Sequence, residues 1–168
     1  VLYIIAQNYA KLRIFNESRY YYSRILEEFE DSKYAQYALV GMAQNLATNG
    51  DKRQPPILYA RAYEGAKDLD TASFVALAWA QWALKNDDKK QAENLIAKVV
   101  SANPSYFLTH IDSTPAQLAL WEQNGLYALS AKAGESMFKK LSNDSFKEKL
   151  MLDVGNWYEL ASLPSDAY

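Results

Sequence analysis

Apolar residues recur at intervals of three and four along most of this chain. Runs with this spacing are Leu2, Ile5, Ala6 and Tyr9; Tyr22, Ile25, Leu26 and Phe29; and Ala92, Leu95, Ile96 and Val99. Because an α-helix turns once in about 3.6 residues, the spacing brings these side chains onto one helical face. Alternating polar and apolar stretches of strand length are absent. The pattern therefore predicts an all-α fold.

The same periodicity gives the expected extent of each helix. Helices are predicted at 1–12, 16–29, 32–47, 56–68, 72–85, 88–101, 115–132, 136–141 and 145–161. Capping signals mark three starts: Asp88 with Gln91, Ser145 with Glu148, and Thr114 followed by Pro115 and Gln117. Short polar turns join many of these helices, and short connections make neighbouring helices antiparallel. We therefore expect a row of helical hairpins.

A short motif repeats along the chain. It consists of a bulky residue, an apolar residue three positions later, a small residue directly after that, and often an aromatic residue three further on. Its occurrences are Leu2, Ile5, Ala6 and Tyr9; Tyr37, Val40, Gly41 and Gln44; Ala76, Trp79, Ala80 and Ala83; Trp121, Asn124, Gly125 and Ala128; and Met151, Val154, Gly155 and Tyr158. The small residues lie 35, 39, 45 and 30 positions apart. We interpret this as a period of about 34 residues with insertions, in which the small residue lets two helices approach closely.

The repeat resembles the tetratricopeptide repeat, in which a second helix carries an A-x3-F pattern and ends near a proline. Ser18, Tyr22 and Ile25 fit that second helix in the first repeat, and the best match is Trp79, Ala80, Ala83, Ala92, Ile96, Val99 and Pro104. The resemblance implies a right-handed superhelix (α-solenoid) of antiparallel helix hairpins. It implies one domain over 1–168, cut from a longer array. Repeats are expected at 1–31, 32–70 and 71–104, with a degenerate stretch at 105–145 and a truncated repeat at 146–168.

A second resemblance concerns the stretch "EEFEDSKYAQYAL" at residues 27–39. It is similar to repeats of bacterial envelope lipoproteins of the outer-membrane assembly and Tol-Pal accessory type, in which a short turn precedes a Tyr-Ala helix. Glu30 stands where those repeats have a proline. The resemblance implies a periplasmic or cell-envelope location.

Composition narrows the classes of partner. The 18 basic and 20 acidic side chains give a net charge of −2, which makes nucleic acid a poor partner because no global positive field would attract phosphates. The absence of cysteine removes disulfides, thiolate metal sites and cysteine nucleophiles. No apolar run reaches the roughly 18 residues that span a bilayer. We expect no cofactor.

Candidate catalytic groups are few. His110 is the single histidine, and with Asp112 and Ser113 it lies in one turn, where the three side chains need not converge. The acidic residues at 27–31 are interpreted as a solvated helix end. Phosphate-binding and nucleophile motifs are absent as well. The sequence therefore predicts a protein that is not an enzyme.

The chain has 13 tyrosines, three of them consecutive at Tyr20, Tyr21 and Tyr22. Consecutive helical residues point about 100° apart, so these three rings cannot share one face. We expect Tyr22 to be buried, Tyr21 to lie against the preceding helix, and Tyr20 to remain free. Most aromatic residues fall on packing positions of the repeat.

In a helical solenoid the first helix of each repeat lines a concave face, which is the usual recognition surface. The residues predicted to line it are Tyr3, Gln7, Lys11, Ala38, Met42, Asn45, Phe74, Leu77, Gln81 and Lys85. Such a mixture of apolar, amide and lysine side chains suits an extended peptide or a partner helix. The Lys and Asn clamp of chaperone-binding repeats is absent, because no Asn stands directly beside Ala6 or Ala80.

The main hypothesis is a non-catalytic scaffold that binds a partner protein or peptide through this face, in a bacterial envelope assembly complex. One alternative is an accessory module for glycan handling or an enzyme-associated domain, in which rings such as Tyr20 and Trp82 stack on sugars. Coplanar, exposed rings along one groove would favour that alternative. A second alternative is a segment that stacks within a longer array or associates with itself.

Overall fold

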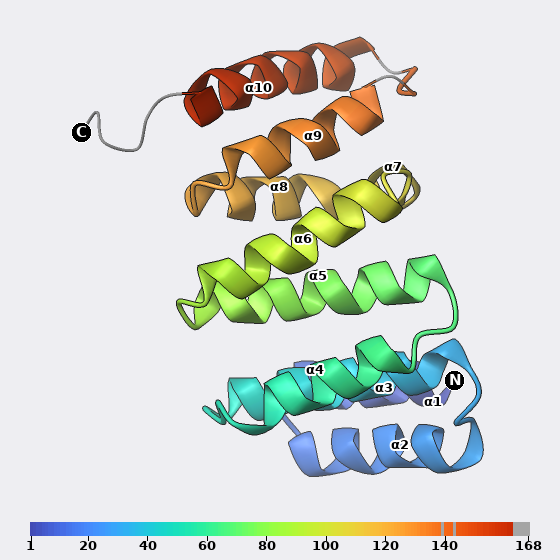
Figure 1. Cartoon of the computed structure of the whole chain (residues 1–168). Coiled ribbons are helices and arrows are strands. Elements are labelled where there is room, and N and C mark those ends of the chain that lie inside the picture. The colour runs from blue at the N-terminus through green and yellow to red at the C-terminus, as the bar shows by residue number, and fades with distance from the viewer. Residues whose placement is uncertain (139, 143, 163–168) are drawn as a thin grey trace. The chain divides into compact units, whose positions relative to one another are not determined.

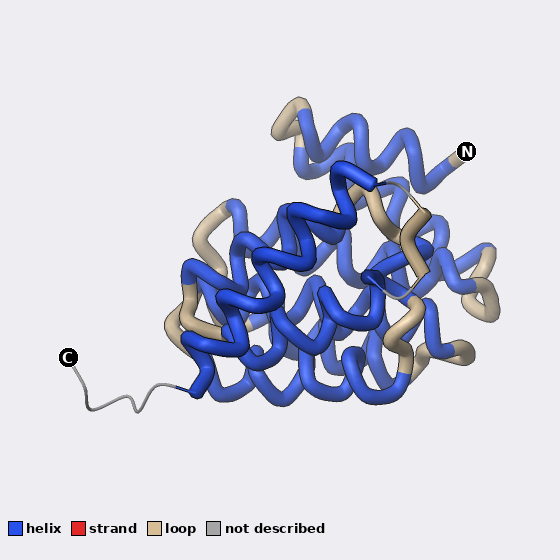
Figure 2. The backbone as a smooth tube through the Cα atoms, turned by 90° about the horizontal axis from the view of Figure 1, so that it is seen from above, coloured by secondary structure: helices blue, strands red, loops and turns tan. Residues whose placement is uncertain are grey.

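The computed structural model describes residues 1–138, 140–142 and 144–162, and these form ten α-helices and no strand (Figure 1). The all-α prediction is confirmed. The helices are α1 (Leu2–Lys11), α2 (Phe15–Glu28), α3 (Lys33–Thr48), α4 (Gln54–Glu64), α5 (Leu69–Lys85), α6 (Lys89–Ala102), α7 (Tyr106–Thr109), α8 (Thr114–Gln123), α9 (Tyr127–Phe138) and α10 (Asp144–Ser162). Short loops join most of them (Figure 2). None of the described helices is both long enough and apolar enough to cross a membrane.

The first six helices match the predicted ones to within a few residues, and side-chain caps account for several of their starts. Asp88 caps α6, because its carboxylate accepts a hydrogen bond from the Gln91 amide at 3.1 Å, as predicted. Asp68 places the start of α5 at Leu69, three residues before the predicted start. Its carboxylate accepts hydrogen bonds from the Thr71 amide at 2.7 Å and the Thr71 hydroxyl at 2.8 Å.

The prediction was wrong between residues 105 and 141. The single helix expected at 115–132 is divided into α8 and α9 by a turn in which Gly125 has a φ of +69°, a conformation that L side chains rarely adopt. The helix expected at 136–141 is the end of α9, and the short α7 was not predicted. Thr114 does not cap α8 with its side chain, because its hydroxyl donates to the carbonyls of Phe107 and His110 instead.

The chain divides into two compact units, Val1–Trp82 and Ala83–Tyr168. In the first unit α1, α2 and α3 pack against one another, and α4 packs on α3. One core cluster joins α1, α2 and α3 through Ala6, Tyr22, Ile25 and Ala38. Another joins α3, α4 and α5 and consists of Leu39, Val40, Ala43, Tyr59, Ala62 and Val75. Apolar faces therefore hold these five helices together, as the periodicity predicts.

In the second unit α9 is the central helix, since it packs against α6, α7, α8 and α10. Its residue Gly134 allows the close contact with α10, because a Cβ there would lie 2.6 Å from Val154 Cγ2 and 3.3 Å from the Trp157 ring. Phe107 of α7 packs edge-on against Trp121 of α8, with ring centroids 5.7 Å apart. Buried aromatic side chains thus fill the space around α9.

The small residues of the repeated motif have different environments. Ala6, Gly41 and Ala80 are buried, and a Cβ on Gly41 would overlap the ring of Tyr22. Gly125 lies in the turn after α8, and a Cβ on Gly155 would meet nothing within 4 Å. The close-approach role is therefore wrong for the last two glycines.

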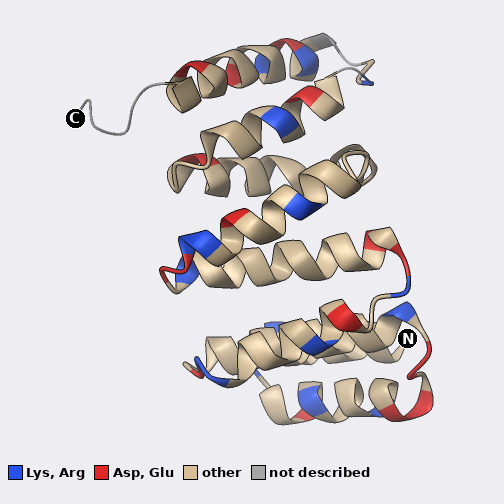
Figure 3. Ribbon diagram, in the orientation of Figure 1, with Lys and Arg blue, Asp and Glu red and all other residues tan. Residues whose placement is uncertain are grey.

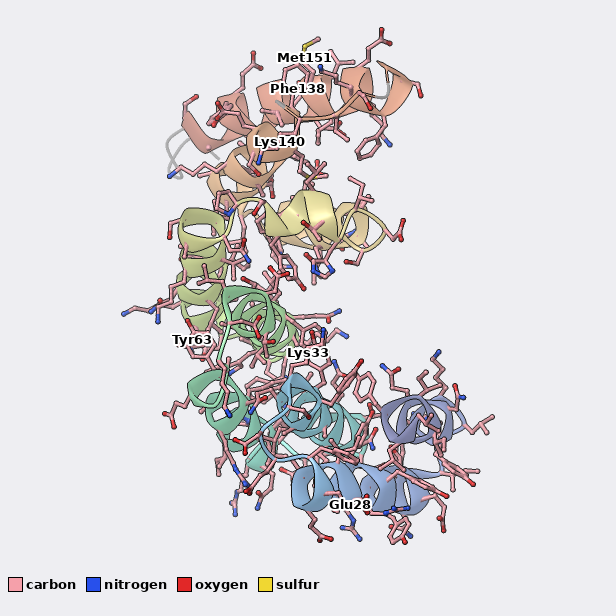
Figure 4. The ribbon with its side chains drawn as sticks, turned by 90° about the vertical axis from the view of Figure 1, so that its right-hand side faces the viewer. Glu28, Lys33, Tyr63, Phe138, Lys140 and Met151 are labelled. Atoms are coloured by element: carbon pink, nitrogen blue, oxygen red, sulfur yellow. The ribbon has the colours of Figure 1, made fainter. Side chains whose placement is uncertain are left out.

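Two bulky residues of the motif at Met151 are not buried as the repeat predicted, although Val154 of the same motif contacts α9 at Gly134. Met151 and Tyr158 are 52% and 41% exposed, and Met151 points away from α9 (Figure 4). The residues that α10 buries are Leu150 and Trp157, which are offset by one position from that motif. Ala167, where the truncated repeat was expected to continue, lies outside the described residues.

Because the Asp68 carboxylate caps α5, we expect the stability of the fold to depend on pH. The backbone and side-chain hydrogen bonds from Thr71 lower the pKa of the Asp68 carboxyl. A carboxyl group whose pKa is lowered by folding stabilises the native state at pH values above its unfolded-state pKa, which is near 4. This contribution to stability disappears as the pH falls through the folded-state pKa. We expect the stability advantage of the wild type over Asp68→Asn in urea unfolding to shrink on acidification below about pH 5. A constant advantage across that range would contradict this.

Candidate functional site

Four aromatic side chains from three helices of the first unit form a continuous row, which we call the aromatic row: Tyr3 of α1, Tyr34 and Tyr37 of α3, and Phe74 of α5. The Tyr3 ring lies 5.9 Å from Tyr34 and 5.8 Å from Tyr37, measured between ring centroids. Tyr37 lies 4.5 Å from Phe74. Tyr34 is 47% exposed and the other three rings are half-buried. The row therefore offers a partly exposed aromatic surface that crosses α1, α3 and α5.

Local sequence explains the row. Tyr34 and Tyr37 are three residues apart, so they lie on the same side of α3, with centroids 5.8 Å apart and an edge-on arrangement. Tyr3 approaches them because α1 packs on α3. Tyr3 also contacts the buried Tyr22 of α2, 6.0 Å away. Aromatic pairs at these distances and tilts stabilise one another, so the row is held in place before any ligand arrives.

A buried chain of hydrogen bonds joins α1, α2 and α3, two of which carry the row. The Ser18 hydroxyl donates to the Ala6 carbonyl at 2.8 Å, and the Asn45 amide donates to the Ser18 oxygen at 2.8 Å. Ser18 is fully buried and Asn45 is 7% exposed. Because a buried polar group without a partner is costly, these bonds specify one register for α1, α2 and α3.

Within the row, Tyr3 is uncharged at physiological pH. Burial raises the pKa of Tyr3, and the neighbouring phenols of Tyr22, Tyr37 and Tyr34 raise it further. Tyr3 thus keeps its proton, and its oxygen accepts a hydrogen bond from Gln7 Nε2 at 3.1 Å. The Lys33 ammonium lies 5.9 Å from the centroid of the Tyr34 ring, within the range of a cation–π contact. The surface is apolar with polar edges.

The structure distributes the predicted concave-face residues over different environments. Tyr3, Gln7 and Phe74 belong to or touch the row, and Met42 is half-buried. Ala38, Asn45 and Leu77 are buried within the helical packing, at 0%, 7% and 6% exposure, and their contacts are structural. Lys11, Gln81 and Lys85 are exposed, with Lys85 in the second unit. A partner-binding role for these residues stays a prediction.

Sequence reasoning did not identify Tyr34 as a candidate and treated Tyr37 only as a packing residue. The signal that could have found them is the spacing of two tyrosines by three residues on α3, in register with Tyr3 of the helix that packs beside it. That pairing requires knowledge of which helices are neighbours in space.

A small pocket of about 80 Å³ lies between the start of α2 and the end of α3. Its polar lining consists of Asn16, Arg19, Asn45 and Asn49, and Met42 adds an apolar wall. An asparagine amide has both a donor and an acceptor, as a peptide group does. The pocket therefore supplies further groups that can hydrogen-bond a peptide, in the same unit as the aromatic row.

The triplet of His110, Asp112 and Ser113 is not a catalytic triad. The Ser113 hydroxyl donates to the His110 backbone carbonyl at 3.1 Å, and the His110 ring stacks on Tyr106 with centroids 4.1 Å apart. Asp112 is exposed. The described residues contain no group of three His, Cys, Asp or Glu side chains placed to hold a metal ion.

The acidic residues at 27–31, at the end of α2 and in the loop that follows it, are exposed and charged (Figures 3 and 4). Glu28 pairs with Arg24 at 2.7 Å, and Asp31 pairs with Lys67 at 2.6 Å. The hydrogen bond from Lys67 lowers the pKa of the Asp31 carboxyl. Exposed ion pairs of this kind contribute little to stability, and they fit the predicted solvated helix end.

The expectations for the three consecutive tyrosines agree with the structure. Tyr22 is 2% exposed, and Tyr21 stacks on Tyr9 of α1 with centroids 5.6 Å apart and planes 8° apart. Tyr20 is 57% exposed and meets Tyr21 edge-on.

The rings of the aromatic row are not coplanar, since their planes are tilted by 48° to 86° relative to one another. Among the described rings there is no coplanar, exposed series of the kind that sugar stacking would use, and Trp82 packs beside the buried Tyr59.

Comparison with known proteins assigns no family to this chain. Neither a family model nor a curated protein matches the sequence.

Proposed function

We propose that this chain is a non-catalytic interaction scaffold that binds a peptide segment of a partner protein across the aromatic row. The observation that supports this most is the continuity of Tyr3, Tyr34, Tyr37 and Phe74 over α1, α3 and α5. The helices belong, in this proposal, to a tetratricopeptide-like solenoid whose first helices carry the recognition surface. The bacterial envelope location implied by residues 27–39 remains part of the proposal.

The chemistry of the row suits a peptide. Half-buried rings that already pack on one another lose little side-chain entropy when a ligand covers them, and aromatic side chains are the commonest anchors at protein interfaces. The bound segment would place apolar side chains against the rings. Phenol hydroxyls and the Gln7 amide would hydrogen-bond its backbone. The pocket at Asn16 and Arg19 lies on the same unit and could receive a polar end of the segment.

Selection from a random peptide library displayed on phage tests this function without knowledge of the natural partner. We expect the chain to select peptides that carry apolar or aromatic side chains. In NMR spectra of the chain with ring-labelled tyrosine, adding a selected peptide should shift the signals of Tyr34 and Tyr37, because the peptide covers them. The signal of Tyr20, which lies outside the row, should not move. Shifts confined to other helices would contradict the assignment.

A further inference from the structure

An apolar cleft lies in the other unit, between α8 and α10, and has a volume of about 240 Å³. Leu118 of α8 and Leu150 and Trp157 of α10 line it and are 3–4% exposed. On α8 the lining residues recur at intervals of three and four, so one face of that helix meets one face of α10 across the cleft. α9 contacts both helices and fixes their separation. The cleft is thus built by packing of regular helices.

The rim of this cleft carries two carboxylates. Glu122 of α8 and Asp153 of α10 line it, together with Lys149. Within the part of the chain that the structure describes, neither carboxylate forms an ion pair, although Lys149 lies on the same cleft. An apolar cleft with two unpaired carboxylates is complementary to an apolar side chain flanked by cations.

The turn between α1 and α2 has these complementary properties. Leu12 is 69% exposed and Ile14 is 45% exposed, and the intervening Arg13 and the preceding Lys11 are exposed as well. Neither cation forms an ion pair with a described residue. Backbone hydrogen bonds fix the turn: Arg13 N to the Ala10 carbonyl at 2.9 Å and Ile14 N to the Tyr9 carbonyl at 2.9 Å.

The turn also carries a strained residue. Arg13 has a φ of +61°, in the left-handed region where glycine or asparagine is usual. The packing of α1 on α2 holds it there, so the arginine side chain and Leu12 are presented outward in a fixed geometry. A rigid turn with an exposed leucine between two cations is a suitable knob for the cleft.

We propose that the cleft between α8 and α10 binds the Lys11–Ile14 turn of a second copy of this chain. Leu12 of one copy enters the cleft over Leu118, Leu150 and Trp157 of the other. Lys11 and Arg13 then lie near Glu122 and Asp153. The donor turn and the acceptor cleft are different surfaces, so the contact is heterologous, and each added copy leaves one free turn and one free cleft. The assembly therefore forms head to tail, as an open chain or a closed ring, and it grows with concentration.

Sedimentation velocity of the whole chain over a series of concentrations tests the proposal. The wild type should show a sedimentation coefficient that rises with concentration. Leu12→Asp should weaken association by about tenfold or more, because it removes the buried leucine and adds a charge. The matched control is Ile57→Asp, since Ile57 is 62% exposed and lies on α4, away from the turn. This control should associate as the wild type does.

Charge exchange identifies the two surfaces as partners. Arg13→Glu and Glu122→Arg should each weaken association about threefold, and a chain that carries both changes should recover most of the loss, because the two charges are exchanged across the contact. Mixing Leu12→Asp with Ala119→Arg, whose side chain fills the cleft, should give a one-to-one complex that does not grow. Circular dichroism verifies that each variant keeps its helical content.

Three results would overturn the proposal. The first is a wild-type chain that remains monomeric at all concentrations reached. The second is equal loss of association in the Ile57→Asp control. The third is the absence of recovery in the charge-exchanged chain. If the chain is monomeric but a synthetic peptide of residues 10–15 binds wild type and not Ala119→Arg, the cleft accepts a segment of another protein, and the second copy is the wrong occupant. These results are separate from the peptide selection on the aromatic row.

Discussion

Replacement of Tyr59 by alanine is expected to lower the free energy of unfolding by about 3–5 kcal/mol. Tyr59 is 1% exposed and is among the largest fully buried side chains. It lies on α4 in the cluster that joins α3, α4 and α5, and its ring stacks on Trp79 with planes 12° apart. Deleting it leaves a cavity among helices that cannot close over it without losing their other contacts. Urea unfolding followed by circular dichroism measures the loss.

The matched control is Tyr20→Ala, the same chemical change at a ring that is 57% exposed. It should change the free energy of unfolding by no more than about 0.5 kcal/mol. Tyr59→Phe keeps the ring and should lose far less than the alanine variant. Hydrogen exchange localises the effect, since protection should fall in α3, α4 and α5. An unchanged urea midpoint for Tyr59→Ala would contradict the assignment of this cluster as a core of the first unit.

Gly41→Leu is expected to destabilise the chain by about 2 kcal/mol or more. Even a Cβ at this position would overlap the ring of Tyr22, which is 2% exposed and held between α1, α2 and α3. Overpacking a core costs about 1–3 kcal/mol or more. The better helix propensity of leucine returns up to about 1 kcal/mol. Because the Tyr22 ring is buried, it cannot move into solvent to make room for the leucine. The steric overlap therefore outweighs the gain in helix propensity, and the net change is a loss of stability.

A double-mutant cycle separates this steric effect from any change in helix propensity. Tyr22→Ala alone should cost about 3 kcal/mol or more, because it opens a cavity. In the chain that carries both changes the leucine fills part of that cavity. The double variant should therefore lose at least about 1 kcal/mol less stability than the sum of the losses in the two single variants. Gly155→Leu is the control, because no atom lies within 4 Å of a Cβ there. Additive costs would show that Gly41 and Tyr22 are not in contact.

The sequence predicted helices well where each one has a clear apolar face and a capped start. Asp88 and Gln91 show this, since the expected cap is present. It failed between 105 and 141 because Gly125 turns the chain inside a continuous apolar pattern, and periodicity alone does not reveal a left-handed residue. On α10 the small residue of the repeated motif was assigned the wrong role, because Gly155 has the spacing of Gly41 but Gly134 of α9 makes the close contact.

The candidate site was only partly predictable for a related reason. Tyr3 and Phe74 were identified from their repeat positions, but Tyr37 joins them only because α1 and α5 both lie beside α3. Asn45 was expected on the binding face and instead donates to Ser18 in the interior. Burial and partners depend on which helices meet, and a single sequence gives no direct information on such contacts.

The most direct test of the aromatic row is the affinity of a library-selected peptide for matched single-ring variants. Isothermal titration calorimetry should show that Tyr34→Ala binds the peptide about 30-fold more weakly than the wild type, because a tyrosine ring that anchors a contact is typically worth about 2 kcal/mol. The Tyr34→Ala, Phe74→Ala double variant should bind more weakly still, with unchanged far-UV circular dichroism. Tyr20→Ala should bind as the wild type does. Equal affinities for the Tyr34→Ala and Tyr20→Ala variants would contradict the account.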